Sequence, residues 1–94
     1  MNAQLRNAIS SHFVRLLREE RERRGISMNV LAAKAGLNHS AISRIEAQLR
    51  SPNLDTLIRI AHVLEIDLGD IFKEALRAAS PNAKTTRRKG AGKC

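Results

Sequence analysis

The segment Gly25–Leu49 constrains the fold of this chain more than any other part of it. The segment holds two helix-capping candidates, Ser27 and Asn38. Its apolar residues, small residues and glycines are spaced as two short helices require. Gly36 supplies the left-handed residue at which a helix stops. Two short helices joined by a tight glycine turn cross at about 90–120° only where the contact residue is small, as Ala32 is. The segment therefore predicts one short helix after Ser27 and a second from His39 to about Gln48.

A long helix is expected before this segment. Residues Asn2–Arg24 contain no glycine or proline, and their apolar positions recur every three or four residues, which is the helical period. Gly25 closes the helix. The serines at positions 10 and 11 leave open a break, because paired serines compete for backbone hydrogen bonds.

Two more helices are expected after the segment. Pro52 disfavours a helical residue before it, and Asn53 caps a fourth helix that runs to about Glu65. Asp67 at the N-cap and an aspartate three residues later open a fifth helix that ends near Ala79. No strand periodicity is present, so the predicted fold class is all-α with five helices. The expected N-caps of the second to fifth helices are Ser27, Asn38, Asn53 and Asp67.

The apolar stripes of these helices predict the core. The expected buried residues are Val30, Leu31, Ala32 and Ala35 in the second helix; Ala41, Ile42, Ile45 and Leu49 in the third; and Leu54, Leu57, Ala61 and Leu64 in the fourth.

The charge of the chain points to a polyanionic partner. Lys and Arg number 17 against 9 Asp and Glu, which gives a net charge of +8. The excess lies in residues 1–24 and 81–94, whereas residues 25–80 are neutral. Specificity in the middle of the chain must therefore come from individual side chains. We divide the chain into a domain over residues 1–79 and a disordered basic tail over residues 80–94, whose Pro, Asn, Lys, Thr, Arg and Gly cannot offset the entropy of ordering.

Several classes of protein are disfavoured. A chain of 94 residues has little room for both a core and a deep substrate pocket. It holds no nucleophile constellation, zinc-type cluster or phosphate-cradling glycine loop, so we expect no enzyme, metal or small-molecule cofactor. No run of 18 apolar residues and no secretory signal is present, and the single Cys94 cannot build a disulfide framework. The expected location is the cytoplasm of a bacterial or phage-type system.

The third helix has a distinctive outward face. A helical wheel places His39, Ser40, Ser43 and Arg44 together, opposite its aliphatic residues. Short polar groups with one arginine make a face slim enough for a DNA major groove about 12 Å wide, where arginine pairs with guanine O6 and N7. This arrangement predicts a helix-turn-helix that reads DNA.

Several motifs at fixed spacing over about residues 12–74 resemble one family. They are Leu16-Leu17-Arg18-Glu19-Glu20-Arg21, Gly25-Ile26-Ser27, Leu31-Ala32, Gly36-Leu37, Ala41-Ile42-Ser43-Arg44-Ile45-Glu46, Ser51-Pro52-Asn53-Leu54-Asp55-Thr56-Leu57 and Ile66-Asp67-Leu68-Gly69-Asp70-Ile71-Phe72. The chain resembles the Cro and lambda-repressor-like helix-turn-helix family, of the xenobiotic-response-element type. The resemblance implies a five-helix DNA-binding domain, commonly a homodimeric regulator of transcription, whose third helix reads bases.

The resemblance also implies roles for individual residues. Base contact falls on His39, Ser40 and Arg44, with Ser43 nearby. Phosphate contact falls on Ser27, Asn38, Lys34 and Arg50. A structural ion pair between Arg21 and Glu46 bridges the first and third helices. The chain departs from the family pattern at Met28, where an amide side chain is frequent, and at Gln48, where glycine is frequent.

The fifth helix carries more apolar surface than one small body needs. We interpret Leu68, Ile71, Phe72 and Leu76 as candidates for a dimer interface, and Leu5 and Ile9 could serve the same end. The predicted function is a sequence-specific double-stranded-DNA-binding regulator, such as a phage-type repressor or a restriction-modification controller, bound to a palindromic operator as a homodimer. Two alternatives stay open: an antitoxin that represses its own synthesis, and a protein-interaction module that has lost DNA binding.

Overall fold

The structure is a computed structural model, and it describes residues 1–79. Five α-helices make up the described part of the chain: α1 (Ala3–Arg23), α2 (Met28–Ala35), α3 (His39–Glu46), α4 (Leu54–Leu64) and α5 (Leu68–Ala79). The predicted all-α, five-helix fold is confirmed. The predicted basic tail over residues 80–94 lies outside the described residues.

The N-terminus of each of the first four helices is capped by a short polar side chain. In each case the side-chain oxygen accepts a hydrogen bond from the backbone N–H three residues later, over 2.7–3.1 Å. At α5 the Asp67 carboxylate instead accepts from the N–H of Gly69, two residues later, over 2.7 Å. The expected bond from Asp67 to the third position of α5 is therefore replaced by a bond one residue earlier. The four caps are Asn2, Ser27, Asn38 and Asn53.

The same four helices end in one motif. A residue at the C-cap or directly after it has a positive φ, and two backbone hydrogen bonds, of the 6→1 and 5→2 kind, close the last turn as in a Schellman motif. Glycine supplies the left-handed residue after α1 and α2, whereas Gln48 and Glu65 supply it after α3 and α4, with φ of 62° and 56°. The left-handed residues are Gly25, Gly36, Gln48 and Glu65.

The predicted long first helix is confirmed, and it runs unbroken through the serines at positions 10 and 11, where the sequence leaves a break open. Two details of the sequence prediction are wrong. Helix α3 ends at Glu46, about two residues earlier than expected, because Gln48 is left-handed. Three residues expected in the core are exposed: Val30 at 42%, Leu49 at 79% and Leu54 at 69%. Leu49 leaves the aliphatic face of α3 because it lies beyond the last turn of that helix.

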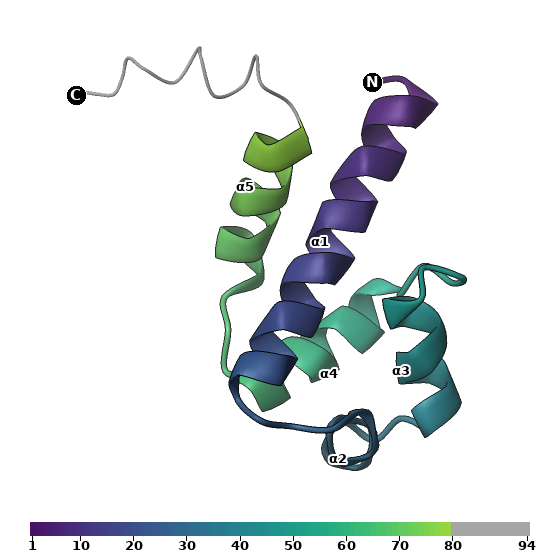
Figure 1. Cartoon of the computed structure of the whole chain (residues 1–94), viewed down its shortest axis with the longest axis vertical. Helices are drawn as coiled ribbons and strands as arrows, with labels where there is room; N and C mark the ends of the chain where they lie inside the picture. Colours follow the sequence, from purple (N-terminus) through teal and green to yellow (C-terminus); the bar gives the residue numbers. More distant parts are fainter. Residues whose placement is uncertain (80–94) are drawn as a thin grey trace, which may run out of the picture.

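The helices pack around one aliphatic core. Helix α5 lies alongside the N-terminal part of the long helix α1, while α2 and α3 lie at the other end of the molecule and α4 crosses between them (Figure 1). Ile42 of α3 and Leu64 of α4 are fully buried. Because the aliphatic side of α3 is held by this core, its other side faces outward. The buried core cluster is Val14, Leu17, Leu31, Ala32, Ile42, Ile45, Ile60, Leu64 and Ile71.

In the part of the chain that the structure describes, no helix combines the length and the hydropathy needed to cross a lipid bilayer.

Candidate nucleic-acid interface

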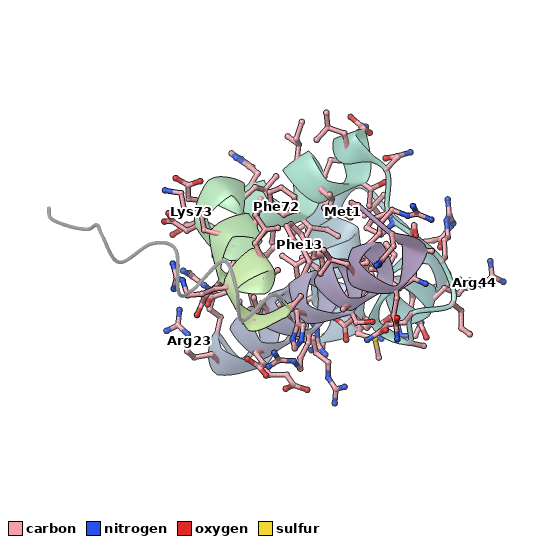
Figure 2. All side chains as sticks on the ribbon, turned by 90° about the horizontal axis from the view of Figure 1, so that it is seen from above. Met1, Phe13, Arg23, Arg44, Phe72 and Lys73 are labelled. Carbon is pink, nitrogen blue, oxygen red and sulfur yellow. The ribbon has the colours of Figure 1, made fainter. Side chains whose placement is uncertain are left out.

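The outward face of α3 carries the residues expected to contact bases. His39, Ser40 and Arg44 are exposed, and Ser43 is half-buried. On the opposite side of the helix Ile42 and Ile45 are 1% and 3% exposed. Figure 2 shows the Arg44 side chain at the outer edge of the molecule, directed away from the body. The core thus presents these four polar residues to solvent as one set.

The residues expected to contact phosphate lie on α2, at the N-caps of α2 and α3, and in the loop that follows α3. Ser27, Lys34, Asn38 and Arg50 are all exposed. The oxygens of Ser27 and Asn38 already accept the capping bonds of α2 and α3. Their hydroxyl and amide hydrogens remain available as donors, which are what a phosphate needs. The N-terminal amides of α2 add further donors at the positive end of a helix dipole.

Ion pairing separates the cations that hold the fold from those that are available to a ligand. The arginines at positions 15, 18, 21, 23 and 24 of the first helix and its end all pair with carboxylates, and Arg59 pairs with Asp55. Six other cations within residues 1–79 make no ion pair: Arg6, Lys34, Arg44, Arg50, Lys73 and Arg77. Five of the six arginines in residues 1–24 are therefore held in ion pairs, whereas Lys34, Arg44 and Arg50 are among the cations that remain available to a ligand.

The ion pair of Arg21 and Glu46 joins α1 to α3. Arg21 donates from Nε and Nη2 to the two carboxylate oxygens of Glu46, over 2.6 and 2.9 Å, and from Nη1 to the carbonyl of Ile26 over 2.7 Å. The two side chains are only 10% and 13% exposed. The hydrogen bonds to Glu46 raise the pKa of Arg21 above its ordinary value, against the opposing effect of burial. This bidentate contact sets the orientation of α3 relative to α1.

A second contact, which the sequence analysis missed, braces the turn between α2 and α3. Arg59 of α4 donates from Nη1 to the carbonyl of Ala35, the last residue of α2, over 3.2 Å, and from Nε to Asp55 over 2.9 Å. A Cβ atom on Gly36 would lie 2.8 Å from the same guanidinium. The glycine therefore serves both the left-handed turn and the close approach of Arg59.

The two departures from the family pattern have structural accounts. Gln48 takes the left-handed conformation in which glycine is frequent, and its Oε1 accepts a hydrogen bond from the Ser11 hydroxyl of α1 over 2.7 Å. Met28 is half-buried and packs against the core. The first departure thus adds a tether between α1 and the end of α3, and the second extends the core.

The four candidates for a dimer interface are not equally accessible. Ile71 belongs to the core and is 9% exposed, while Leu68 and Leu76 are half-buried. Phe72 is 49% exposed, and its ring packs edge-on against Phe13 of α1, with the ring centroids 5.9 Å apart. Of the four, only Phe72 offers a large free surface. Among residues 1–79 no group of three His, Cys, Asp or Glu side chains is placed to hold a metal ion.

Comparison with known proteins assigns the family. A family model described as helix-turn-helix matches residues 17–71, which span α2, α3, α4 and parts of the two outer helices. The chain belongs to the helix-turn-helix family. The resemblance to the Cro and lambda-repressor type of helix-turn-helix is thereby confirmed.

Relatives in the helix-turn-helix family are transcriptional regulators. The HTH-type transcriptional regulator PuuR of Escherichia coli (strain K12) is 37% identical over 65 residues, which cover 69% of this chain and 35% of that protein. The HTH-type transcriptional regulator SlrR of Bacillus subtilis (strain 168) is 34% identical over 59 residues, which cover 62% of this chain and 39% of that protein. The chain thus spans little more than a third of the length of these relatives. No solved structure matches it significantly.

Proposed function

We propose that this helix-turn-helix protein is a sequence-specific regulator of transcription that binds a palindromic double-stranded operator as a homodimer. The observation that carries the proposal is the outward face of α3, where short polar residues surround the unpaired, exposed Arg44. The names of the relatives as transcriptional regulators support the same function.

Each part of the interface has a role in this proposal. Helix α3 enters the major groove, and the Arg44 guanidinium donates two hydrogen bonds to the O6 and N7 atoms of a guanine. His39 and Ser40 contact neighbouring base edges, directly or through water. Lys34 and Arg50 contact phosphates and set the position of α3 without reading sequence.

A homodimer would place two α3 helices in successive major grooves on one face of the duplex. The half-sites would then lie about 34–36 Å apart, and the two-fold symmetry of the protein would be matched by a palindrome. The proposed site of action is the bacterial or phage-type cytoplasm, where such an operator is accessible.

The test starts from a duplex enriched out of a random pool by the wild-type protein. Arg44→Ala should weaken binding to this duplex by about 1–3 kcal/mol, roughly 5- to 150-fold, and should affect a scrambled duplex much less. Lys73→Ala is the matched control. It removes one exposed cation from α5, on the side of the molecule opposite Arg44 (Figure 2).

Titrations at one fixed salt concentration are needed, because phosphate contacts make every affinity salt-dependent. The proposal predicts that Lys73→Ala leaves the ratio of specific to scrambled binding unchanged. Equal losses on the two duplexes for Arg44→Ala would contradict the assignment of Arg44. Absence of any salt-dependent binding by the wild type would favour the alternative of a protein-interaction module.

A further inference from the structure

A groove of about 490 Å³ adjoins the candidate nucleic-acid interface, because Arg50 belongs to both. Its walls come from residues 7–14 of α1, from residues 48–52 between α3 and α4, and from one side chain each of α4 and α5. The hydrogen bond from the Ser11 hydroxyl to Gln48, over 2.7 Å, joins the first two of these walls. Sites for small organic ligands span about 300–1,000 Å³. The groove is therefore large enough for a small organic ligand.

More than half of the groove wall lies outside the segment that assigns the family. The family model matches residues 17–71, whereas the α1 wall and Phe72 of α5 lie beyond that range. Seven of the thirteen lining residues fall in these two parts. The match to the helix-turn-helix family therefore gives the groove no role.

The groove is lined by both phenylalanines of the chain, which holds no tryptophan or tyrosine. Phe13 of α1 and Phe72 of α5 pack edge-on with their ring centroids 5.9 Å apart (Figure 2). Phe72 nevertheless stays 49% exposed, and Leu49, which also lines the groove, is 79% exposed. Aromatic rings pack favourably on one another, and covering apolar surface from water is itself favourable. The groove thus offers an apolar surface that suits the ring of an aromatic ligand.

The charge of the groove favours an anion. Arg50 is the only charged residue among the thirteen that line it. Its guanidinium is exposed and makes no ion pair within residues 1–79. A guanidinium holds a carboxylate through two parallel hydrogen bonds. The Gln48 oxygen accepts from Ser11, so its amide nitrogen remains as a further donor. One cation without an acidic neighbour balances the single charge of a carboxylate better than the nearly double charge of a phosphate monoester.

We propose that this groove binds a small aromatic carboxylate and that the bound ligand weakens the binding of DNA. The ring of the ligand packs against Phe72 and Leu49, and its carboxylate pairs with Arg50. The effect on DNA rests on the proposed function, in which Arg50 contacts a phosphate. Because the carboxylate neutralises the charge that the phosphate needs, ligand and DNA each lower the affinity for the other by the same factor.

The first test measures binding of cinnamate to the full chain without DNA, by isothermal titration calorimetry. Saturable binding is expected. Cinnamyl alcohol lacks the charge and acetate lacks the ring, so each should bind at least about tenfold more weakly than cinnamate.

Three variants locate the site. Arg50→Gln should weaken cinnamate binding by at least about tenfold, because it removes a hydrogen-bonded charge pair. Phe72→Leu keeps an apolar side chain but loses the ring, and should weaken binding by about two- to tenfold. Arg77→Gln is the matched control for charge. It removes an exposed cation from α5 that does not line the groove, and it should leave the affinity unchanged. Circular dichroism verifies that each variant is folded.

The second test measures the effect of the ligand on DNA at one fixed salt concentration. Saturating cinnamate should lower the affinity of the wild type for the enriched duplex to about that of Arg50→Gln. Cinnamyl alcohol at the same concentration should have no effect. The response to cinnamate should be lost in Arg50→Gln and retained in Arg77→Gln.

Each failure would overturn a stated part of the proposal. Absence of saturable cinnamate binding, or binding that both Arg50→Gln and Phe72→Leu leave unchanged, would overturn the site. Equal affinities for cinnamate and cinnamyl alcohol would overturn the assignment of a carboxylate. Bound cinnamate that leaves the affinity for DNA unchanged would overturn the regulatory effect. If the wild type binds cinnamate but enriches no duplex, the proposed function fails and the ligand site stands.

Discussion

The ion pair between Arg21 and Glu46 allows a quantitative test of how α3 is held. Replacing Arg21 by methionine keeps most of the side-chain volume but removes all three of its hydrogen bonds, two to Glu46 and one to the carbonyl of Ile26. The Glu46 carboxylate is then left 13% exposed without its charged partner. Replacing Glu46 by leucine leaves the reverse problem, a buried guanidinium with one remaining acceptor.

The magnitude follows from the burial of the pair. Removing one member of a buried ion pair typically costs about 3–5 kcal/mol, because the other charge stays desolvated and unpaired. Since 1 kcal/mol shifts the melting temperature of a domain this size by about 4–8 °C, either single variant should melt at least about 12 °C below the wild type. The double variant Arg21→Met/Glu46→Leu removes both charges, so it should lie within about 2 kcal/mol of the wild type.

Urea unfolding followed by circular dichroism measures all four proteins at one pH and temperature. A double-mutant cycle should give a coupling energy of at least about 2 kcal/mol, well above the error of roughly 0.3–0.5 kcal/mol expected for independent sites. A double variant whose loss equals the sum of the single losses would refute the reasoning, since the two residues would then act independently. Unchanged m-values would show that the denatured state is the same in each comparison.

Three further contacts give direct predictions. The hydrogen bond from Arg24 lowers the pKa of Glu20. Glu20 therefore stabilises the fold above its unfolded pKa of about 4.3, and this contribution is lost as the pH falls below that value. In urea titrations, the difference in unfolding free energy between wild type and Glu20→Gln should shrink as the pH is lowered from about 5. Gln48→Ala keeps the left-handed strain and loses the bond to Ser11, so unfolding should need about 1 kcal/mol less, whereas Gln48→Gly also relieves the strain and should stay within about 1 kcal/mol of the wild type. Arg59→Met removes the brace on the last carbonyl of α2, and hydrogen exchange should be faster at the amides of the turn between α2 and α3 than in the wild type, with little change in α5.

The sequence predicted the helix boundaries where a side chain marks them chemically. Ser27, Asn38 and Asn53 have the short oxygen-bearing side chains that cap helices, and all three do so. Glycine marks the ends of α1 and α2. At the ends of α3 and α4 the left-handed residues are Gln48 and Glu65, which pay about 1–2 kcal/mol for that conformation, so propensity alone cannot place them.

The outward face of the candidate interface was predictable from the sequence, whereas the contacts that hold α3 in place were less so. The helical period of α3 places Arg44 opposite Ile42 and Ile45, and this alone indicates the outward face. The same periodicity put Leu49 in the core, because a wheel cannot show that the helix ends before that residue. The brace from Arg59 joins residues 24 positions apart, so it depends on how α4 packs against α2. No local sequence pattern predicts how α4 packs against α2.

Three contacts from other parts of the chain hold α3 in one orientation in the free protein. Arg21 holds Glu46 from α1, Ser11 of the same helix holds Gln48 just after α3, and Arg59 of α4 holds the turn that precedes α3. A helix that is already oriented loses little further conformational freedom on binding, so more of the contact energy is left to discriminate between sequences. The three contacts that hold α3 and the residues on its outward face therefore have separate effects. In the proposed function, the three contacts set the geometry of α3 against the bases, and the Arg44 guanidinium is the group proposed to select the base at its own position.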